Sequence, residues 1–227
     1  MELAVLIHVG TALVALGAGA VAVTVKKGRR PHISAGHLFV VTMVISVIPA
    51  GVLSFQSGKY FDLVSSLLTV YMVLTGAFAF KPQFRSFLIA MMCFGFICIA
   101  GYLFIEVQGL IGGTRATDAP IGAGYIFASI LGCALYGDVK VLRRGAYPRT
   151  AVMIRHLWRM NFAFFIATLN LFAVRPQFFP EWMQSSGLLM LLAFGPLLIM
   201  GYWRLKLMLK QWKKPSRIKY DPLGVEL

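Results

Sequence analysis

The chain has 227 residues, of which 59% are hydrophobic and 13% are charged, and its formal net charge is +14 at pH 7. Soluble domains carry roughly a quarter charged residues, so this composition excludes an ordinary water-soluble domain and indicates a membrane protein. The positive charge lies in the connections between apolar runs instead of forming one patch, which excludes a nucleic-acid partner.

Seven apolar runs follow one another along the chain, and each is long enough to cross a hydrocarbon core about 30 Å thick as a helix. Helices are expected because every run is continuously apolar rather than alternating. The runs are 3–25, 36–56, 61–80, 86–107, 120–138, 157–174 and 187–203. The sequence therefore predicts an all-α integral membrane protein, a bundle of seven transmembrane helices within residues 1–203.

The lysines and arginines between these runs predict the orientation, because cytoplasmic connections are enriched in them. Nineteen of the 22 lie in connections on one side of the predicted bundle, and only Lys59, Arg115 and Arg175 lie on the other. We therefore expect the N-terminus outside and the C-terminus in the cytoplasm.

Residues 204–227 form a basic tail, which is expected to begin as an amphipathic helix carrying Trp212. Such a stretch binds a membrane surface through apolar burial and charge attraction. Anionic headgroups at the cytoplasmic face are therefore an expected partner.

Four histidines lie in or beside the predicted spans, and polar side chains inside lipid mark candidate functional sites. Counted at about 1.5 Å per residue from the centre of each span, His37 and His156 lie roughly 13 Å toward the cytoplasm. His32 lies deeper in the cytoplasmic interface, whereas His8 lies roughly 9 Å toward the outside. Three histidines are thus expected at one mouth of the bundle, and His8 at a separate outer site, for a quinone or a second cofactor.

Imidazoles at one level on two helices favour a bis-histidine haem b, in which the iron takes one nitrogen from each helix. His32 and Gly36 are four residues apart and share a face, so the glycine leaves room for a flat ring. His32 and His37 lie about 140° apart around the helix, so only one of them points at the site. We expect His156 and His32 to be the axial ligands, with His37 as the other position.

Arg155 and Arg159 are four residues apart and are expected to hold the haem propionates, since arginine matches carboxylates bidentately. Asp138, at the cytoplasmic end of the fifth run, is expected to pair with one of them across the bundle. Each of these residues also has a plain structural interpretation. The arginines would then be interfacial anchors, and the histidines would face headgroups or hydrogen bond a neighbouring helix.

Two segments resemble the signatures of a family of bacterial multi-pass inner-membrane proteins whose function is uncharacterised. They are "HVGTALVALGAGAVAVTVKKGRRPHISAGHLF" (8–39) and "RHLWRMNFAFFIATLNLFAV" (155–174). The first is similar, more faintly, to membrane b-type cytochromes and to haem-related oxidase-assembly proteins. The resemblance implies that His32, rather than His37, is the functional position, and it favours the haem hypothesis.

The leading hypothesis is therefore a membrane-embedded redox or haem-binding protein with a respiratory-chain or quinone partner. A carrier or channel for a small anion, attracted by the basic mouth, stays open, as does an assembly or scaffold protein for a respiratory complex. No Walker-type loop, GxSxG elbow, HExxH helix or dinucleotide fingerprint occurs in the sequence. Whether the protein is an enzyme is left undecided.

Overall fold

A computed structural model describes residues 2–81, 85–111, 120–144 and 148–212 of the chain. Within these ranges the regular structure is helical, in eight α-helices and two short 3-10 helices at Phe78–Phe80 and Pro176–Phe178. The α-helices are α1 (Glu2–Thr24), α2 (Arg30–Gln56), α3 (Tyr60–Ala77), α4 (Arg85–Ile111), α5 (Ala123–Arg144), α6 (Arg149–Phe172), α7 (Glu181–Ser185) and α8 (Leu188–Trp212).

Among the described residues, six helices are long and apolar enough to cross a membrane, namely α1, α2, α3 with its 3-10 extension, α4, α5 and α8. These six helices indicate a multi-pass membrane protein. The predicted run 157–174 corresponds to the remaining long helix, α6, which has 24 residues and is therefore about 36 Å long at 1.5 Å per residue. Its arginines and asparagines make it more polar than the other long helices.

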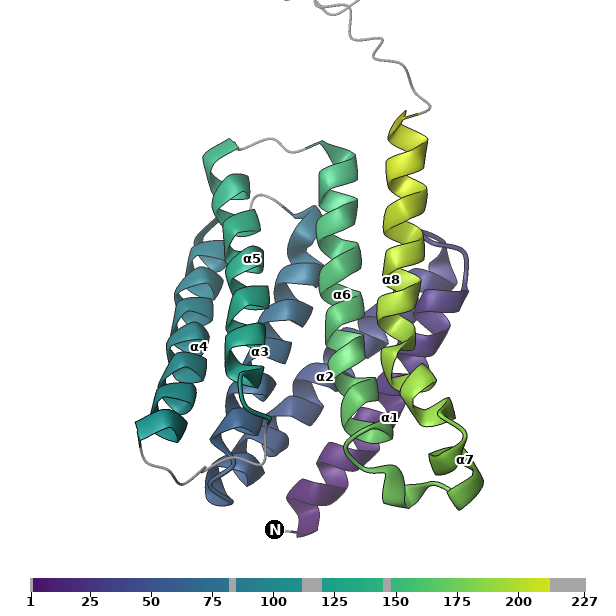
Figure 1. Cartoon of the computed structure of the whole chain (residues 1–227). Helices are drawn as coiled ribbons and strands as arrows, with labels where there is room; N and C mark the ends of the chain where they lie inside the picture. The colour runs from purple at the N-terminus through teal and green to yellow at the C-terminus, as the bar shows by residue number, and fades with distance from the viewer. Residues whose placement is uncertain (1, 82–84, 112–119, 145–147, 213–227) are drawn as a thin grey trace, which may run out of the picture.

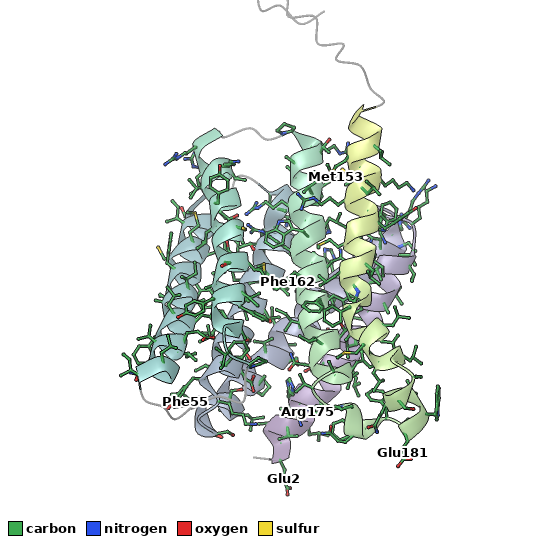
Figure 2. The ribbon with its side chains drawn as sticks, viewed as in Figure 1. Glu2, Phe55, Met153, Phe162, Arg175 and Glu181 are labelled. Carbon is green, nitrogen blue, oxygen red and sulfur yellow. The ribbon has the colours of Figure 1, made fainter. Side chains whose placement is uncertain are left out.

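α6 lies in the middle of the bundle, although it is the most polar of the long helices. α1 and α2 pair as a hairpin, α2 packs on α3, α3 on α4, and α4 on α5. α6 packs against α3 and α8 and also approaches α1 (Figure 1). Figure 2 shows side chains projecting outward from the helices, and many of the exposed ones are large apolar residues. Apolar outer faces are what contact with lipid requires.

The two ends of the bundle differ in charge. The C-terminal ends of α1, α3, α5 and α8 lie together with the starts of α2, α4 and α6 (Figure 1), and we call this the basic end. It carries Lys26, Lys27, Arg29, Arg30, Lys81, Arg85, Lys140, Arg143 and Arg149. The opposite end carries Glu2, Arg175 and Glu181, which are labelled in Figure 2. In the described residues, positive charge is therefore concentrated at one end of the bundle, as it is on one side of the predicted bundle in the sequence.

Helices extend past the predicted apolar runs at the basic end. α2 begins at Arg30 instead of residue 36, so His32 lies in its first turn rather than in a loop. α5 continues to Arg144 instead of residue 138, and α6 begins at Arg149 instead of residue 157. The cause is that hydropathy marks only the stretch that contacts hydrocarbon. Charged residues with good helix propensity extend the same helix into the interface.

The predicted basic tail starts as part of the last helix. α8 continues without a break through residue 203 to Trp212, so the first residues of the 204–227 segment prolong a span instead of forming a separate surface helix. Residues 213–227 lie outside the described part of the chain.

Buried polar side chains are few, and most bond within their own helix. The buried polar residues are Thr42, Ser46, Thr69, Thr75, Asp138, Arg159, Asn161 and Thr168. The threonines and Asn161 donate to a carbonyl one turn earlier, which offsets much of the cost of burying these donors. Asp138 and Arg159 differ, because they are charged and form an ion pair between helices.

Candidate functional site

Asp138 forms the centre of a buried polar cluster between α5 and α6. Its side chain is 0% exposed. Its Oδ1 accepts hydrogen bonds from Nη2 of Arg155 and Nη2 of Arg159, each at 2.6 Å. The ion pair expected across the bundle is therefore present, and it involves both arginines. The two are four residues apart, which places them on one face of α6.

Tyr71 adds a third helix, α3, to the cluster. Its hydroxyl donates to Oδ2 of Asp138, so both carboxylate oxygens have partners. The guanidinium carbon of Arg159 lies 5.5 Å from the centre of the Tyr71 ring, and its Nη2 also donates to the Ala134 carbonyl at 2.8 Å. Hydrogen bonds to charged groups are stronger than neutral ones, so the cluster fastens α3, α5 and α6 together.

The two arginines keep unused hydrogen-bond donors. Nε of Arg155 and both Nε and Nη1 of Arg159 are buried and have no partner among the described residues. The Arg159 side chain is 1% exposed and that of Arg155 is 12% exposed. Two guanidinium groups face one carboxylate, so the cluster holds a formal surplus of one positive charge. Such a surplus with free N–H groups favours an anionic partner.

His156 faces the bundle and not the lipid. It lies about 100° around α6 from Arg155, and its Nδ1–H donates to the Gly76 carbonyl of α3 at 3.0 Å. The Phe80 ring packs on it with 5.3 Å between centroids. A Cβ at Gly76 would lie 3.0 Å from Sδ of Met160, so glycine lets α3 approach α6 closely at this point.

His32 lies in the first turn of α2 and meets His156. Its Nδ1–H donates to the Ala22 carbonyl near the end of α1 at 2.9 Å. The two imidazole rings are 6.4 Å apart between centroids, with 79° between their planes. A carbonyl oxygen only accepts, so Nδ1 carries the proton in each ring, and Nε2 of the neutral ring has a free lone pair. Histidines that bind metals are typically held in this way, through their other nitrogen.

His37 and Gly36, the other two α2 residues expected at the site, lie in different surroundings. His37 is exposed, so it does not join His32 and His156. Gly36, one turn after His32, has open space where a Cβ would stand, with no atom within 4 Å. The structure thus brings together His32 and His156 and leaves His37 outside.

His8 lies on α1, in the half toward the opposite end, away from the His32–His156 pair. Its Nδ1 is 2.9 Å from the Ser46 carbonyl and 3.0 Å from Ser46 Oγ. The Ser46 hydroxyl also donates to the His8 carbonyl at 3.1 Å. His8 thus joins α1 to α2, in agreement with its structural interpretation as an interhelical hydrogen-bonding residue.

Sequence reasoning missed the roles of Tyr71 and Gly76. Tyr71 is one of several tyrosines and asparagines inside the apolar runs, and nothing in the sequence distinguishes it from the others. The depth count applied to the histidines places Tyr71 at the centre of its run and Asp138 roughly 13 Å toward the basic end of its own, so it does not predict their contact. Gly76 carries no signal either, because its role depends on how closely α3 approaches α6.

Comparisons of the chain with protein-family models, with curated proteins and with solved structures find no match. The resemblance to a family of inner-membrane proteins therefore stays a prediction. The chemistry of the site rests on its geometry alone.

Proposed function

We propose that the protein is a redox-active protein of the bacterial inner membrane that binds haem b between α2 and α6, with His32 and His156 as axial ligands. The observation that carries the proposal is the anchoring of both rings. Each Nδ1–H donates to a main-chain carbonyl, of Ala22 or of Gly76, and this leaves two Nε2 lone pairs from different helices for one iron.

The donor set suits a haem because the porphyrin supplies the other four nitrogens and only two axial ligands come from the protein. A separation of 6.4 Å between the ring centroids is close to the roughly 6 Å expected when two imidazoles each bind one metal at about 2 Å. Open space beside Gly36 and the apolar ring of Phe80 further support the fit. The expectation that Arg155 and Arg159 hold the propionates has no support in their contacts, because both guanidinium groups bond to Asp138 on α5.

Haem bound at this position would supply reversible one-electron chemistry. The chain's own residues have positioning tasks. The carbonyls of Ala22 and Gly76 fix the orientation of the two rings and keep the proton on Nδ1. The Phe80 ring covers one side of His156 and limits the access of water to it.

The test is the visible spectrum of the full-length protein purified from haem-sufficient cells. We expect a Soret band, reduced-minus-oxidised peaks of a b-type haem, and one haem per chain by pyridine haemochrome assay. His32→Ala and His156→Ala should each remove the low-spin spectrum. His37→Ala is the matched control, since it removes an exposed histidine from the same helix as His32.

The haem proposal fails if the purified protein shows no Soret band and acquires none on addition of haemin. It also fails if His37→Ala loses the band while His32→Ala keeps it. Circular dichroism of each variant separates loss of haem from loss of fold.

We also propose that the chain crosses the membrane seven times, with its N-terminus outside and its C-terminus in the cytoplasm. The proposal is supported by the gathering of positive charge at the basic end, since such charge marks cytoplasmic segments. The central position of α6, between α3 and α8, supports a seventh span. Arg155 and Arg159 of α6 pair with Asp138 inside the bundle instead of facing lipid.

Reporter fusions test this topology. Green fluorescent protein attached after Leu227 should fluoresce, and alkaline phosphatase attached there should be inactive. Alkaline phosphatase inserted at Gln177, beyond α6, should be active. An inactive phosphatase at Gln177 together with a fluorescent C-terminal fusion would mean that α6 and α8 do not both cross the membrane.

A further inference from the structure

The charge of the Asp138 cluster is unbalanced within the described part of the chain. One carboxylate faces two guanidinium groups, and its Oδ1 already accepts from both Arg155 and Arg159. Its Oδ2 accepts from the Tyr71 hydroxyl. The single negative charge of Asp138 is therefore shared between two guanidinium groups.

No second acid among the described residues stands near the cluster. The other described acids are Glu2, Asp62, Glu106 and Glu181. Glu2 and Glu181 lie at the opposite end (Figure 2), and Asp62 lies in the first turn of α3, which starts there. Glu106 accepts from the main-chain N–H groups of Gly122 and Gly124 at the start of α5. The missing negative charge therefore has to come from outside these residues.

A small cavity adjoins the unbalanced charge. It has a volume of about 20 Å³ and lies between α3, α4, α5 and α6. Its polar lining comes from Thr75, Lys81 and Arg155, and its apolar lining includes Leu88, Val141 and two phenylalanines. Two of the lining side chains are cationic and none is acidic. Arg155 also has a buried Nε–H without a partner.

We infer that this cavity binds a single small inorganic anion of about the size of chloride, against the Arg155 guanidinium. The anion would neutralise the surplus charge of the cluster and give Arg155 the acceptor that the described residues do not provide. This site is separate from the proposed haem, because His156 leaves α6 toward α3 and α2 while Arg155 faces Asp138 on α5.

The size of the cavity restricts the ligand. A space of 10–15 Å³ or more on this measure holds about one water molecule, so about 20 Å³ accepts a monatomic ion. Phosphate, a carboxylic acid and a lipid headgroup each need several times the space of one water molecule. A single water in the same place is the competing occupant, and it would leave the surplus charge in place.

The test uses the full-length protein in detergent micelles, with sodium gluconate as the background salt because gluconate is too large to enter. Equilibrium binding of radiolabelled chloride is measured, with bromide as the competitor. We expect saturable binding of one chloride per chain, displaced by bromide and not by gluconate.

Three variants locate the ion. Val141→Ile adds one methylene to the cavity wall and changes no charge, so it should fold and weaken chloride binding by about tenfold or more. Arg155→Gln should weaken binding at least as much. Arg85→Gln is the matched control, because within the described part of the chain this arginine at the same end donates to the Leu142 carbonyl, at 3.3 Å, and not to Asp138. It should leave the affinity within roughly twofold of the wild type.

Absence of saturable chloride binding to the wild-type protein overturns the inference and leaves water as the occupant. Equal affinity in Val141→Ile also overturns it, because a folded variant with a filled cavity should have lost the ion. A Val141→Ile variant that loses chloride but keeps the haem spectrum of the wild type supports a site independent of haem. Chloride binding without any haem spectrum would refute the haem proposal and leave the chloride site supported.

Discussion

Asp138 is the residue whose neutralisation should disturb the bundle most. In Asp138→Asn the side chain keeps its shape, but two buried guanidinium groups lose the one carboxylate that the described residues give them, along with two ion pairs of 2.6 Å. Removing one partner of a buried ion pair typically costs about 3–5 kcal/mol. Because the amide oxygen still accepts, we expect about 3 kcal/mol, a large part of the roughly 5–15 kcal/mol that stabilises a typical folded protein.

The measurement is unfolding in mixed micelles by titration with sodium dodecyl sulfate, followed by circular dichroism and by tryptophan fluorescence. Trp158 lies 5.7 Å from the Arg159 guanidinium carbon and reports on the cluster. Glu181→Gln is the control, since Glu181 is exposed at the opposite end, and it should change the free energy of unfolding by less than about 0.5 kcal/mol. A loss below about 1 kcal/mol in Asp138→Asn would refute the importance of the charge pairing.

A companion variant separates charge from packing. Replacing Asp138 by Leu and both Arg155 and Arg159 by Met removes every charge of the cluster while keeping most of its volume. Exchanging a complete buried ion cluster for apolar residues is often neutral or stabilising by about 1–4 kcal/mol. We therefore expect the triple variant to be more stable than Asp138→Asn. If both are equally unstable, lost packing and not unpaired charge is the cause.

Three further changes test the contacts around the site. Gly76→Ala places a Cβ 3.0 Å from Sδ of Met160. This overpacking should lower the free energy of unfolding by about 1–3 kcal/mol in the same assay. An unchanged free energy of unfolding would mean that α3 and α6 are farther apart. Thr168→Val removes the bond to the Ala193 carbonyl at 2.8 Å and should cost about 1 kcal/mol, whereas an unchanged midpoint would show that this bond does not hold α8. Burial lowers the pKa of Lys27 below its usual 10.5. The unfolded chain then binds more protons between the folded pKa and 10.5, so stability rises with pH in that window, and Lys27→Gln should flatten this rise.

The sequence predicted the helices well because a long apolar run leaves few alternatives in lipid. All seven runs correspond to long helices, and α6 is among them despite its polarity. The ends were less predictable at the basic end, where Arg149 and Thr150 belong to α6 but carry no hydropathy signal. His156, which was expected at the mouth of a span, therefore lies within the body of α6.

The site was predictable in part. Opposite charges inside apolar runs have few partners, so Asp138 and the two arginines were expected to pair, and the pair is present. The choice between His32 and His37 depended on helical phase, which the sequence left open. Only packing of α2 against α1 and α6 decides it, because the Ala22 carbonyl fixes His32 while His37 is exposed.

The polarity of α6 has a consequence for the way the chain enters the membrane. An arginine at the centre of an isolated helix costs about 2.5–3.5 kcal/mol during insertion, and Arg159, which lies inside the apolar run near its basic end, adds a part of this cost. α6 is therefore a poor insertion signal when it emerges alone from the ribosome. α5 precedes it and carries the matching carboxylate of Asp138, so the two helices should leave the translocon as a pair. Biogenesis would then depend on the order in which this acid and these two bases are synthesised.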